Sequence, residues 1–214
     1  MNESSSDTGR RMLARENVVQ PMAAHECAQT AAMLARAFRD NPGMVAVLKG
    51  DGAARRAESL SAILLGFVAA THRYGSVEVV KRGESVVAAA LAFPPGRFPP
   101  PLGFELATAW AVARGRLARA HRFARWDHEV RRRHLRAPHF YLWFLGVEPE
   151  RQGQGLGSQL LRSLSSKADA VRMPCFLETD REKNVGLYQH HGYRITSHDP
   201  LPGIGTRVWW MQRG

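Results

Sequence analysis

Residues 145–157 read LGVEPERQGQGLG, and this stretch decides the fold. Its first residues complete an apolar run that begins at His139, and Pro149 follows that run. Three glycines come next, at 153, 155 and 157, and a segment with apolar residues at helical spacing follows them. That order predicts a buried strand, a short loop and a helix over 155–171. The glycines let successive backbone N–H groups face one concavity, and the helix N-terminus adds unpaired donors and partial positive charge. The stretch therefore predicts an anion site suited to a pyrophosphate.

Two commoner phosphate-binding motifs do not fit these glycines. The dinucleotide fingerprint requires G-x-G-x-x-G, whereas the order here is G-x-G-x-G. The Walker motif requires Lys followed by Ser or Thr after its last glycine, and Ser158-Gln159 stands there instead. A turn that uses glycine only for tight strand–helix packing is the remaining alternative.

The rest of the chain supplies the other elements of a mixed sheet. Its patterns predict strands at 18–21, 76–81, 85–93, 139–147, 174–179, 193–197 and 206–212. They predict helices at 24–39, 53–74, 102–133 and 183–191, an end to the first helix at the Asp-Asn-Pro-Gly of 40–43, and a loop at 198–205. Alternation of strand and helix in the second half requires a parallel crossover. We expect an α/β (α+β) fold, with a twisted mixed sheet of about seven strands, flanking helices and a helical insertion between strands 3 and 4.

Charge is concentrated in that insertion. Residues 1–15 are predicted to be a disordered tail, residues 16–214 a single domain, and residues 102–136 its basic helical insertion. The net charge is +11, and nine arginines lie between 111 and 136 against Asp127 and Glu129. The basicity is therefore a regional feature. Two distant cysteines, Cys27 and Cys175, favour a reducing, cytoplasmic location, and no apolar run reaches the ~20 residues that cross a bilayer.

Several motifs in order carry a family resemblance. Gln152-x-x-Gly155-x-Gly157 resembles the Q/R-x-x-G-x-G/A signature of the GCN5-related N-acetyltransferase (GNAT) superfamily, and it follows a strand that ends in Leu-Gly-Val. Downstream, Asn184, Tyr188 and Gly192-Tyr193 are similar to the family's N-x-x-x-Y-x-x-x-G-F/Y segment. Residues 138–193, the Leu-Glu-Thr at 177–179 and the chain end RVWWM at 207–211 resemble the puromycin N-acetyltransferase branch.

The resemblance implies an acetyl-CoA-dependent N-acetyltransferase that uses no metal. The acetyl group of acetyl-CoA would pass to a primary amine of a small molecule, antibiotic-like or metabolite-like, by direct attack in a ternary complex. The last part of the strand over 139–147 would splay from its parallel neighbour and pair with pantetheine like an added strand. The residues implied in cofactor binding are Leu145, Gly146, Val147, Gln152, Gly153, Gln154, Gly155, Leu156, Gly157 and Asn184.

Two catalytic residues are predicted. Tyr188 matches the family's general acid, which would protonate the departing thiolate; a core aromatic is the alternative. Asn184, one helical turn earlier, would contact a pantetheine carbonyl or serve merely as a helix cap. Relatives place a carboxylate on the strand before the splay, but Tyr141-Leu142-Trp143-Phe144 offers none. Glu178, which alternates onto one face with Phe176 and Asp180, is the candidate base through water, with a structural salt bridge to an arginine as the alternative.

Three classes of function remain open at this level. A small-molecule N-acetyltransferase is preferred, a protein acetyltransferase acting on lysine or an N-terminus is second, and a nucleic-acid-binding module is third. The arginine segment lacks the interleaved surface aromatics of single-strand binders, so nucleic acid is not expected as a partner. A basic lid over an acidic acceptor, or a solvated helix face, accounts for the segment. A homodimer is compatible with the sequence, which does not determine the oligomeric state.

Overall fold

The computed structural model describes residues 18–50, 52–113, 117–202 and 205–214. The predicted tail at 1–15 lies outside these residues, as do Arg114 and Arg116 of the insertion. The described residues form a seven-stranded sheet of order β1-β2-β3-β4-β5-β7-β6. Its strands are β1 (Val19–Pro21), β2 (Ser76–Arg82), β3 (Ser85–Phe93), β4 (Phe140–Val147), β5 (Cys175–Thr179), β6 (Arg194–Pro200) and β7 (Arg207–Arg213). The predicted mixed sheet is confirmed, because β4 and β5 run parallel and the remaining neighbours are antiparallel.

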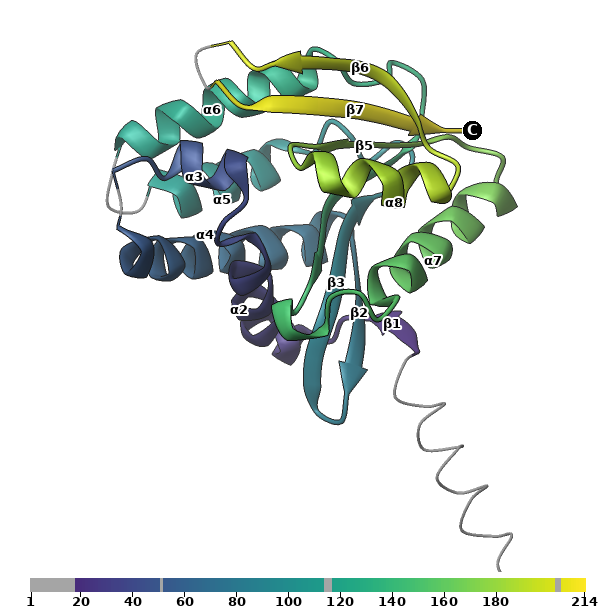
Figure 1. Cartoon of the computed structure of the whole chain (residues 1–214), viewed down its shortest axis with the longest axis horizontal. Helices are drawn as coiled ribbons and strands as arrows, with labels where there is room; N and C mark the ends of the chain where they lie inside the picture. The colour runs from purple at the N-terminus through teal and green to yellow at the C-terminus, as the bar shows by residue number, and fades with distance from the viewer. Residues whose placement is uncertain (1–17, 51, 114–116, 203–204) are drawn as a thin grey trace, which may run out of the picture.

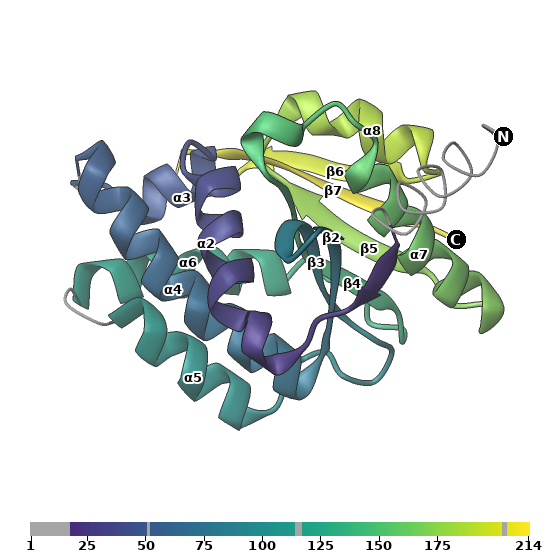
Figure 2. The ribbon, with the colours of Figure 1, turned by 90° about the horizontal axis from the view of Figure 1, so that it is seen from below.

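Helices cover both faces of this sheet (Figures 1 and 2). One face carries α2 (Cys27–Phe38), α4 (Ala53–Tyr74), α5 (Leu102–Ala113) and α6 (Leu117–Arg131). The other carries α7 (Leu156–Ala170) and α8 (Val185–His190). Short 3₁₀ turns precede α2, α7 and α8 at Ala24–Glu26, Pro149–Arg151 and Glu182–Asn184. The insertion between β3 and β4 is helical as predicted, but it forms two helices, α5 and α6, where the sequence indicated one.

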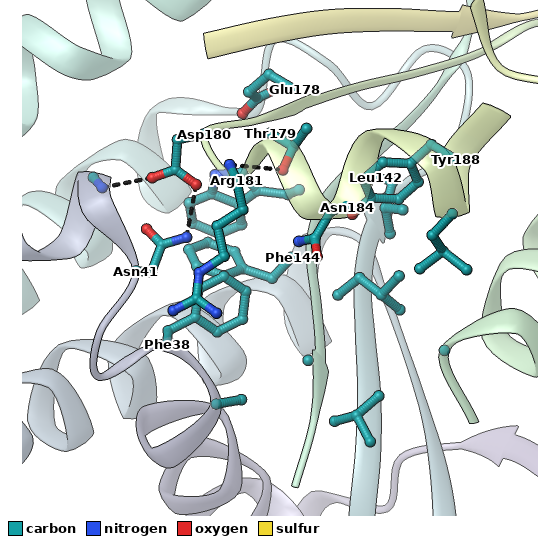
Figure 3. A pocket seen from close by; sticks show the side chains of 18 of the residues that line it. Phe38, Asn41, Leu142, Phe144, Glu178, Thr179, Asp180, Arg181, Asn184 and Tyr188 are labelled. Atoms are coloured by element: carbon teal, nitrogen blue, oxygen red, sulfur yellow. Dashed lines mark hydrogen bonds between the residues drawn. The ribbon is translucent and has the colours of Figure 1, made fainter. Parts of the chain in front are cut away.

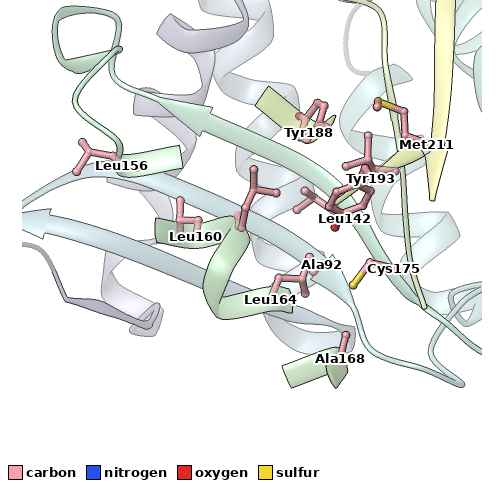
Figure 4. Packing of buried hydrophobic residues seen from close by; sticks show 14 of the residues in the cluster. Ala92, Leu142, Leu156, Leu160, Leu164, Ala168, Cys175, Tyr188, Tyr193 and Met211 are labelled. Atoms are coloured by element: carbon pink, nitrogen blue, oxygen red, sulfur yellow. The ribbon is translucent and has the colours of Figure 1, made fainter. Parts of the chain in front are cut away.

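Apolar stripes along the helices explain why the helices pack on the faces of the sheet. On α7 the inward residues recur at helical spacing and pack on the small alanines of β3 and on β4. Figure 4 shows this layer continuing through Cys175, Tyr188 and Tyr193 to Met211. Cys175 is fully buried in this layer. The buried residues of α7 are Leu156, Leu160, Leu161, Leu164, Ser165 and Ala168.

The structure adds one helix that the sequence did not predict and moves one predicted boundary. The Asp-Asn-Pro-Gly at 40–43 does end α2, yet it also begins a further helix, α3 (Pro42–Val47). Asn41 is the N-cap, its side chain accepts a 3.2 Å hydrogen bond from Met44 N, and Pro42 occupies the first helical position. That pair is a helix-start signal. The predicted loop at 198–205 begins later, because β6 continues to Pro200 beside β7.

Candidate functional site

The only parallel strand pair of the described sheet opens partway along its length. β4 pairs with β5 at three positions, the last being Leu142 opposite Leu177, whereas its pairing with β3 continues to Val147. A register irregularity in that second pairing leaves Trp143 without a β3 partner. Residues 143–147 therefore present an unpaired backbone edge on the β5 side. The splay expected from the sequence is confirmed, and such an edge can accept an extended chain as an added strand.

The glycine turn follows this edge directly. Gly153 and Gly155 both have φ of +78°, a left-handed conformation that glycine adopts without strain, and Gly155 is the N-cap of α7. No atom lies within 4 Å of the position that a Cβ would take on Gly155. Tight packing, the alternative reading of these glycines, does not explain Gly155. The space beside Gly155, at the N-terminus of α7, is instead open.

One cavity of about 570 Å³ joins this turn to the centre of the molecule. Figure 3 shows its wall, with side chains from α2, β4, β5 and α8 converging. Ten predicted site residues line it: Leu145, Gly146, Val147, Gln152, Gly153, Gly155, Leu156, Gly157, Asn184 and Tyr188. Glu178 lines it as well, whereas Gln154 does not and has an exposed side chain. The structure thus brings together residues that lie up to 43 positions apart in the sequence.

Two of the cofactor-binding candidates have contacts that the sequence did not indicate. The Gln152 side chain donates a 3.2 Å hydrogen bond to the Val147 carbonyl, which ties the loop back onto the end of β4. Gly146 packs against α2, since a Cβ there would overlap the Leu34 side chain. Glu148, in the same loop, holds α2 through a bidentate pair with Arg36 at 2.6 and 2.8 Å. These contacts fix the turn relative to the sheet and to α2.

Tyr188 and Asn184 stand one helical turn apart on the cavity wall. Tyr188 is 6% exposed, and its ring meets that of Tyr193 edge-on at 6.0 Å. Burial, and then the charges of Glu178 and Asp180, raise the pKa of Tyr188 well above its ordinary value, so the phenol stays protonated. Asn184 occupies the N-cap position of α8, but its side chain makes no capping hydrogen bond. Its amide remains available to the cavity.

Glu178 has a partner on β4 instead of an arginine. The Tyr141 hydroxyl donates a 2.7 Å hydrogen bond to Glu178 Oε1, and Glu178 forms no ion pair with the described residues. Oε2 is buried and has no hydrogen-bond partner in the described structure. Burial raises the pKa of Glu178 to about 8, aided by the charges of Asp127 and Asp180 and opposed by the Tyr141 bond. The structural salt bridge considered from the sequence is therefore not the role of this side chain.

Asp180 also lies on the cavity wall, although the sequence gave it no role. It accepts hydrogen bonds from Asn41 Nδ2 at 2.7 Å and from Gly43 N at 2.5 Å, so it holds the start of α3. A Cβ on Gly43 would collide with this carboxylate and with the ring of Trp126. Burial raises the pKa of Asp180, against the lowering effect of these bonds. The alternation of Phe176, Glu178 and Asp180 was the available signal.

The insertion presents aromatic side chains and one carboxylate to the cavity. Phe123, Trp126, Asp127 and Val130 of α6 line it, and Trp143 and Phe144 of β4 add further rings. None of the described arginines of α6 lines the cavity. The face that lids the cavity is therefore aromatic and acidic, in contrast to the basic lid considered from the sequence.

Described arginines of α6 hold the insertion to the rest of the protein and hold its two helices together. Arg122 donates to the carbonyls of Val47 and Lys49, and Arg125 donates to that of Pro202. Arg131 pairs with Asp127 at 2.6 Å and with Glu105 at 2.7 Å. Most of these contacts are to backbone carbonyls or to carboxylates of the chain itself. They give a structural role to three of the nine arginines between 111 and 136, without a ligand.

A splayed parallel pair beside a glycine turn, with both opening on one cavity, defines a protein of the GNAT fold. Residues 107–195 match the family described as the acetyltransferase (GNAT) domain. The match covers less than half of the chain; in this segment and in its fold, the chain is similar to the GNAT superfamily of acetyltransferases. Members use acetyl-CoA as donor. Within the described ranges, no helix combines the length and apolar character needed to cross a bilayer.

Solved structures share the fold over nearly the whole chain. A histone acetyltransferase HPA2 and related acetyltransferase from Corynebacterium glutamicum is 20% identical, with a TM-score of 0.66 over 92% of this chain and 94% of that one. Arylalkylamine N-acetyltransferase 2 from Aedes aegypti is 11% identical, with a TM-score of 0.62 over 92% and 97%. A polyamine N-acetyltransferase from Drosophila melanogaster is 19% identical, with a TM-score of 0.56 over 91% and 98%.

Proposed function

We propose that the protein transfers the acetyl group of acetyl-CoA to the primary amine of a small cationic molecule that has an aromatic or otherwise apolar body. One observation carries the proposal. A single cavity connects an unpaired strand edge and glycine turn, suited to the donor, with a chamber of carboxylates and aromatic rings, suited to the acceptor. The two halves meet beside Glu178 and Tyr188.

The donor half fits coenzyme A by its backbone. The unpaired edge of β4 at 143–147 would pair with the pantetheine amides as an added strand would. Its pyrophosphate would sit at the amides of the turn and at the N-terminus of α7, where the partial positive charge favours an anion. Arg151, Arg181 and Lys183 line the same cavity and would neutralise phosphate charge. Asn184 would donate to a pantetheine carbonyl.

The acceptor half fits an organic cation. Asp127, Glu178 and Asp180 contribute three carboxylates, and Phe123, Trp126 and Trp143 contribute aromatic faces. Carboxylates attract an ammonium group, and aromatic faces contact both an apolar body and a cation favourably. The buried Oε2 of Glu178, which lacks a partner, would gain one from the amine of the acceptor.

Acetyl transfer would then use two residues that exchange protons, Glu178 and Tyr188. The neutral amine attacks the thioester carbonyl, a C–N bond forms and the C–S bond breaks. Glu178, as the carboxylate, takes the proton that the amine nitrogen loses, directly or through one water. Tyr188 donates its proton to the departing thiolate of coenzyme A. Its raised pKa keeps that proton in place until the thiolate develops.

The two insect neighbours are named for amine acetylation, which supports an amine acceptor, although each resembles this chain only in fold. The resemblance to the puromycin branch would make a nucleoside-like amine an acceptor of the same kind. Protein lysine acetylation is the competing proposal, because the Corynebacterium glutamicum neighbour is named a histone acetyltransferase. Nucleic-acid binding is not favoured, because Arg122, Arg125 and Arg131 of α6 are engaged within the chain.

The test is a turnover assay that follows free thiol from acetyl-CoA. The acceptor panel holds arylalkylamines, polyamines, aminonucleosides, neutral alcohols of matched shape, and lysine peptides. The expected result is thiol release with cationic small amines and none with the alcohols. Asp127→Asn should raise KM for the preferred amine and leave KM for acetyl-CoA unchanged. Preference for lysine peptides would overturn the acceptor class, and failure of acetyl-CoA to bind in calorimetry would overturn the activity.

A further inference from the structure

The outer face of α5 exposes large apolar side chains that no described residue covers. Leu102, Leu106 and Trp110 are 72%, 63% and 69% exposed, and their spacing of four residues places them in one stripe. Ala109, also exposed, lies beside them. The stripe contains no charged residue. Soluble proteins rarely leave a contiguous apolar patch of this kind uncovered unless it serves an interaction.

The adjoining face of α4 extends this surface. Ala62, Leu65 and Ala69 are exposed at helical spacing, with Leu65 43% exposed. α4 and α5 lie antiparallel and close together, since Gly66 faces Ala111 and the end of α4 at Tyr74 faces Gly103. Figure 2 shows the two helices side by side at the outer edge of the molecule. We call Ala62, Leu65, Ala69, Leu102, Leu106 and Trp110 the α4/α5 face.

Two unpaired charges bracket this face symmetrically. Glu58 and Arg73 are both exposed on the same side of α4 as Leu65, and each lies seven to eight residues from the midpoint between Leu65 and Gly66. Glu58 forms no ion pair with any described residue, and Arg73 contacts only the ring of its neighbour Tyr74, at 5.4 Å. A two-fold axis at that midpoint would set Glu58 of one copy opposite Arg73 of another, twice.

We propose that the α4/α5 face is the interface of a two-fold symmetric homodimer of this protein. The α4/α5 face is complementary to itself, so the partner that fits it is a second copy of this protein. An isologous interface requires that residues on one side of the axis match those on the other, and Glu58 and Arg73 meet this requirement in an antiparallel α4–α4 contact. The small side chains of Ala62 and Ala69 allow the two helices to approach closely around Leu65. The centre of the α4/α5 face carries no positive charge that would bind nucleic acid or anionic lipid.

The size of the face suits a modest dimer. α4 has 22 residues and α5 has 12. With a rise of ~1.5 Å per residue and a helix diameter of ~10 Å, the two together cover roughly 500 Å² per copy. Small specific interfaces bury about 600 Å² per partner. We therefore expect a dimer whose population depends on concentration in the micromolar range.

Sedimentation velocity across a concentration series tests the proposal on the full chain. The wild type should move from monomer to dimer as concentration rises, and Leu106→Glu should remain monomeric. Val171→Glu is the matched control, because Val171 is 54% exposed but follows α7 on the other face of the sheet, and it should dimerise normally. Circular dichroism and melting curves establish that each variant folds.

Charge reversal gives an independent test of the geometry. Glu58→Arg and Arg73→Glu should each weaken the dimer about tenfold, because each places like charges opposite one another. The double variant Glu58→Arg/Arg73→Glu restores opposite charges and should recover the wild-type dissociation constant. A wild type that is monomeric throughout, or a dimer that Leu106→Glu leaves intact, would overturn the proposal. Single reversals without rescue would overturn the antiparallel arrangement.

Discussion

The Tyr141 hydroxyl lies 2.7 Å from Oε1 of Glu178 and donates a hydrogen bond to it. The two residues come from β4 and β5, the parallel pair that separates immediately beyond Leu142 and Leu177. Tyr141 therefore fixes one oxygen of the carboxylate at the point where the cavity opens, and the other oxygen lacks a partner. The proposed base is thus held by a neighbouring strand. With its pKa raised to about 8, a base at Glu178 would give the proposed catalysis a characteristic pH dependence.

Glu178→Gln should lower kcat by about 10²–10⁴-fold, the range that positioned general bases contribute. The amide is nearly the same shape and can still accept the Tyr141 hydrogen bond, so acetyl-CoA affinity should change little. In the wild type, kcat/KM should rise with pH until about pH 8, because the carboxylate is the active form. Steady-state kinetics from pH 6 to 9.5 measure both effects. Near-normal turnover in the variant would remove Glu178 from the mechanism.

The same carboxyl should make the wild type less stable at high pH. Its pKa is raised from 4.5 to about 8 by folding, so the folded state holds the proton more tightly than the unfolded chain. This contribution is fully present below pH 4.5 and is lost as pH rises through about 8. Glu178→Gln lacks it. The melting temperature of the wild type, relative to that of the variant, should therefore fall between pH 5 and pH 9, and a constant difference would contradict the raised pKa.

Tyr141→Phe tests whether Tyr141 positions the base. The phenol bond lowers the pKa of Glu178, so its loss should raise that pKa further. A hydrogen bond to a charged group contributes about 1.5–3 kcal/mol, which corresponds to a shift of about one pH unit or more. At neutral pH kcat/KM should fall about tenfold, and it should recover at higher pH. Because titration of the substrate is common to both enzymes, the ratio of their profiles isolates Glu178. An unchanged profile would leave Tyr141 a packing role only.

Tyr188→Phe keeps the ring against Tyr193 and removes the proton donor. The turnover number should fall by roughly 10²–10⁴-fold, while acetyl-CoA affinity holds within a few-fold. The measurement is kcat at saturating acetyl-CoA, with a melting curve to establish folding. If water protonates the thiolate instead, the loss will stay under about tenfold, which is little more than 1.4 kcal/mol of barrier.

Gly155→Ala tests the glycine turn, with Gly96→Ala as its matched control. The two glycines have φ of +78° and +76°, and neither Cβ would meet an atom within 4 Å, so the backbone strain is the same. Each substitution should cost about 1–2 kcal/mol of stability. Only Gly155 lines the cavity, so only its variant should raise KM for acetyl-CoA, by about tenfold or more. Equal KM values in the two variants would show that the turn does not contact the cofactor.

The segment proposed to bind the donor could be predicted because its determinants are local. Between Leu145 and Gly157, one uninterrupted segment supplies the strand edge, the turn and the start of α7. Glycine spacing and apolar periodicity act within a few residues, so a sequence displays them directly. Tyr188 and Asn184 were found for the same reason, since one helical turn separates them. The helical insertion was located as well, although its division into α5 and α6 was not.

The chamber proposed to bind the acceptor was decided by tertiary structure. Tyr141 meets Glu178 only because parallel pairing sets Tyr141 opposite Phe176, and Asp180 meets Asn41 across 139 residues of chain. Helix packing places Phe123 and Trp126 of α6 against the cavity, and no sequence pattern indicated this. The sequence determined the sheet, its order of elements and the donor motif. Strand register and helix packing decided which carboxylates share the cavity. A contact between distant segments produces no periodic pattern in the sequence around either residue, so the sequence did not indicate it.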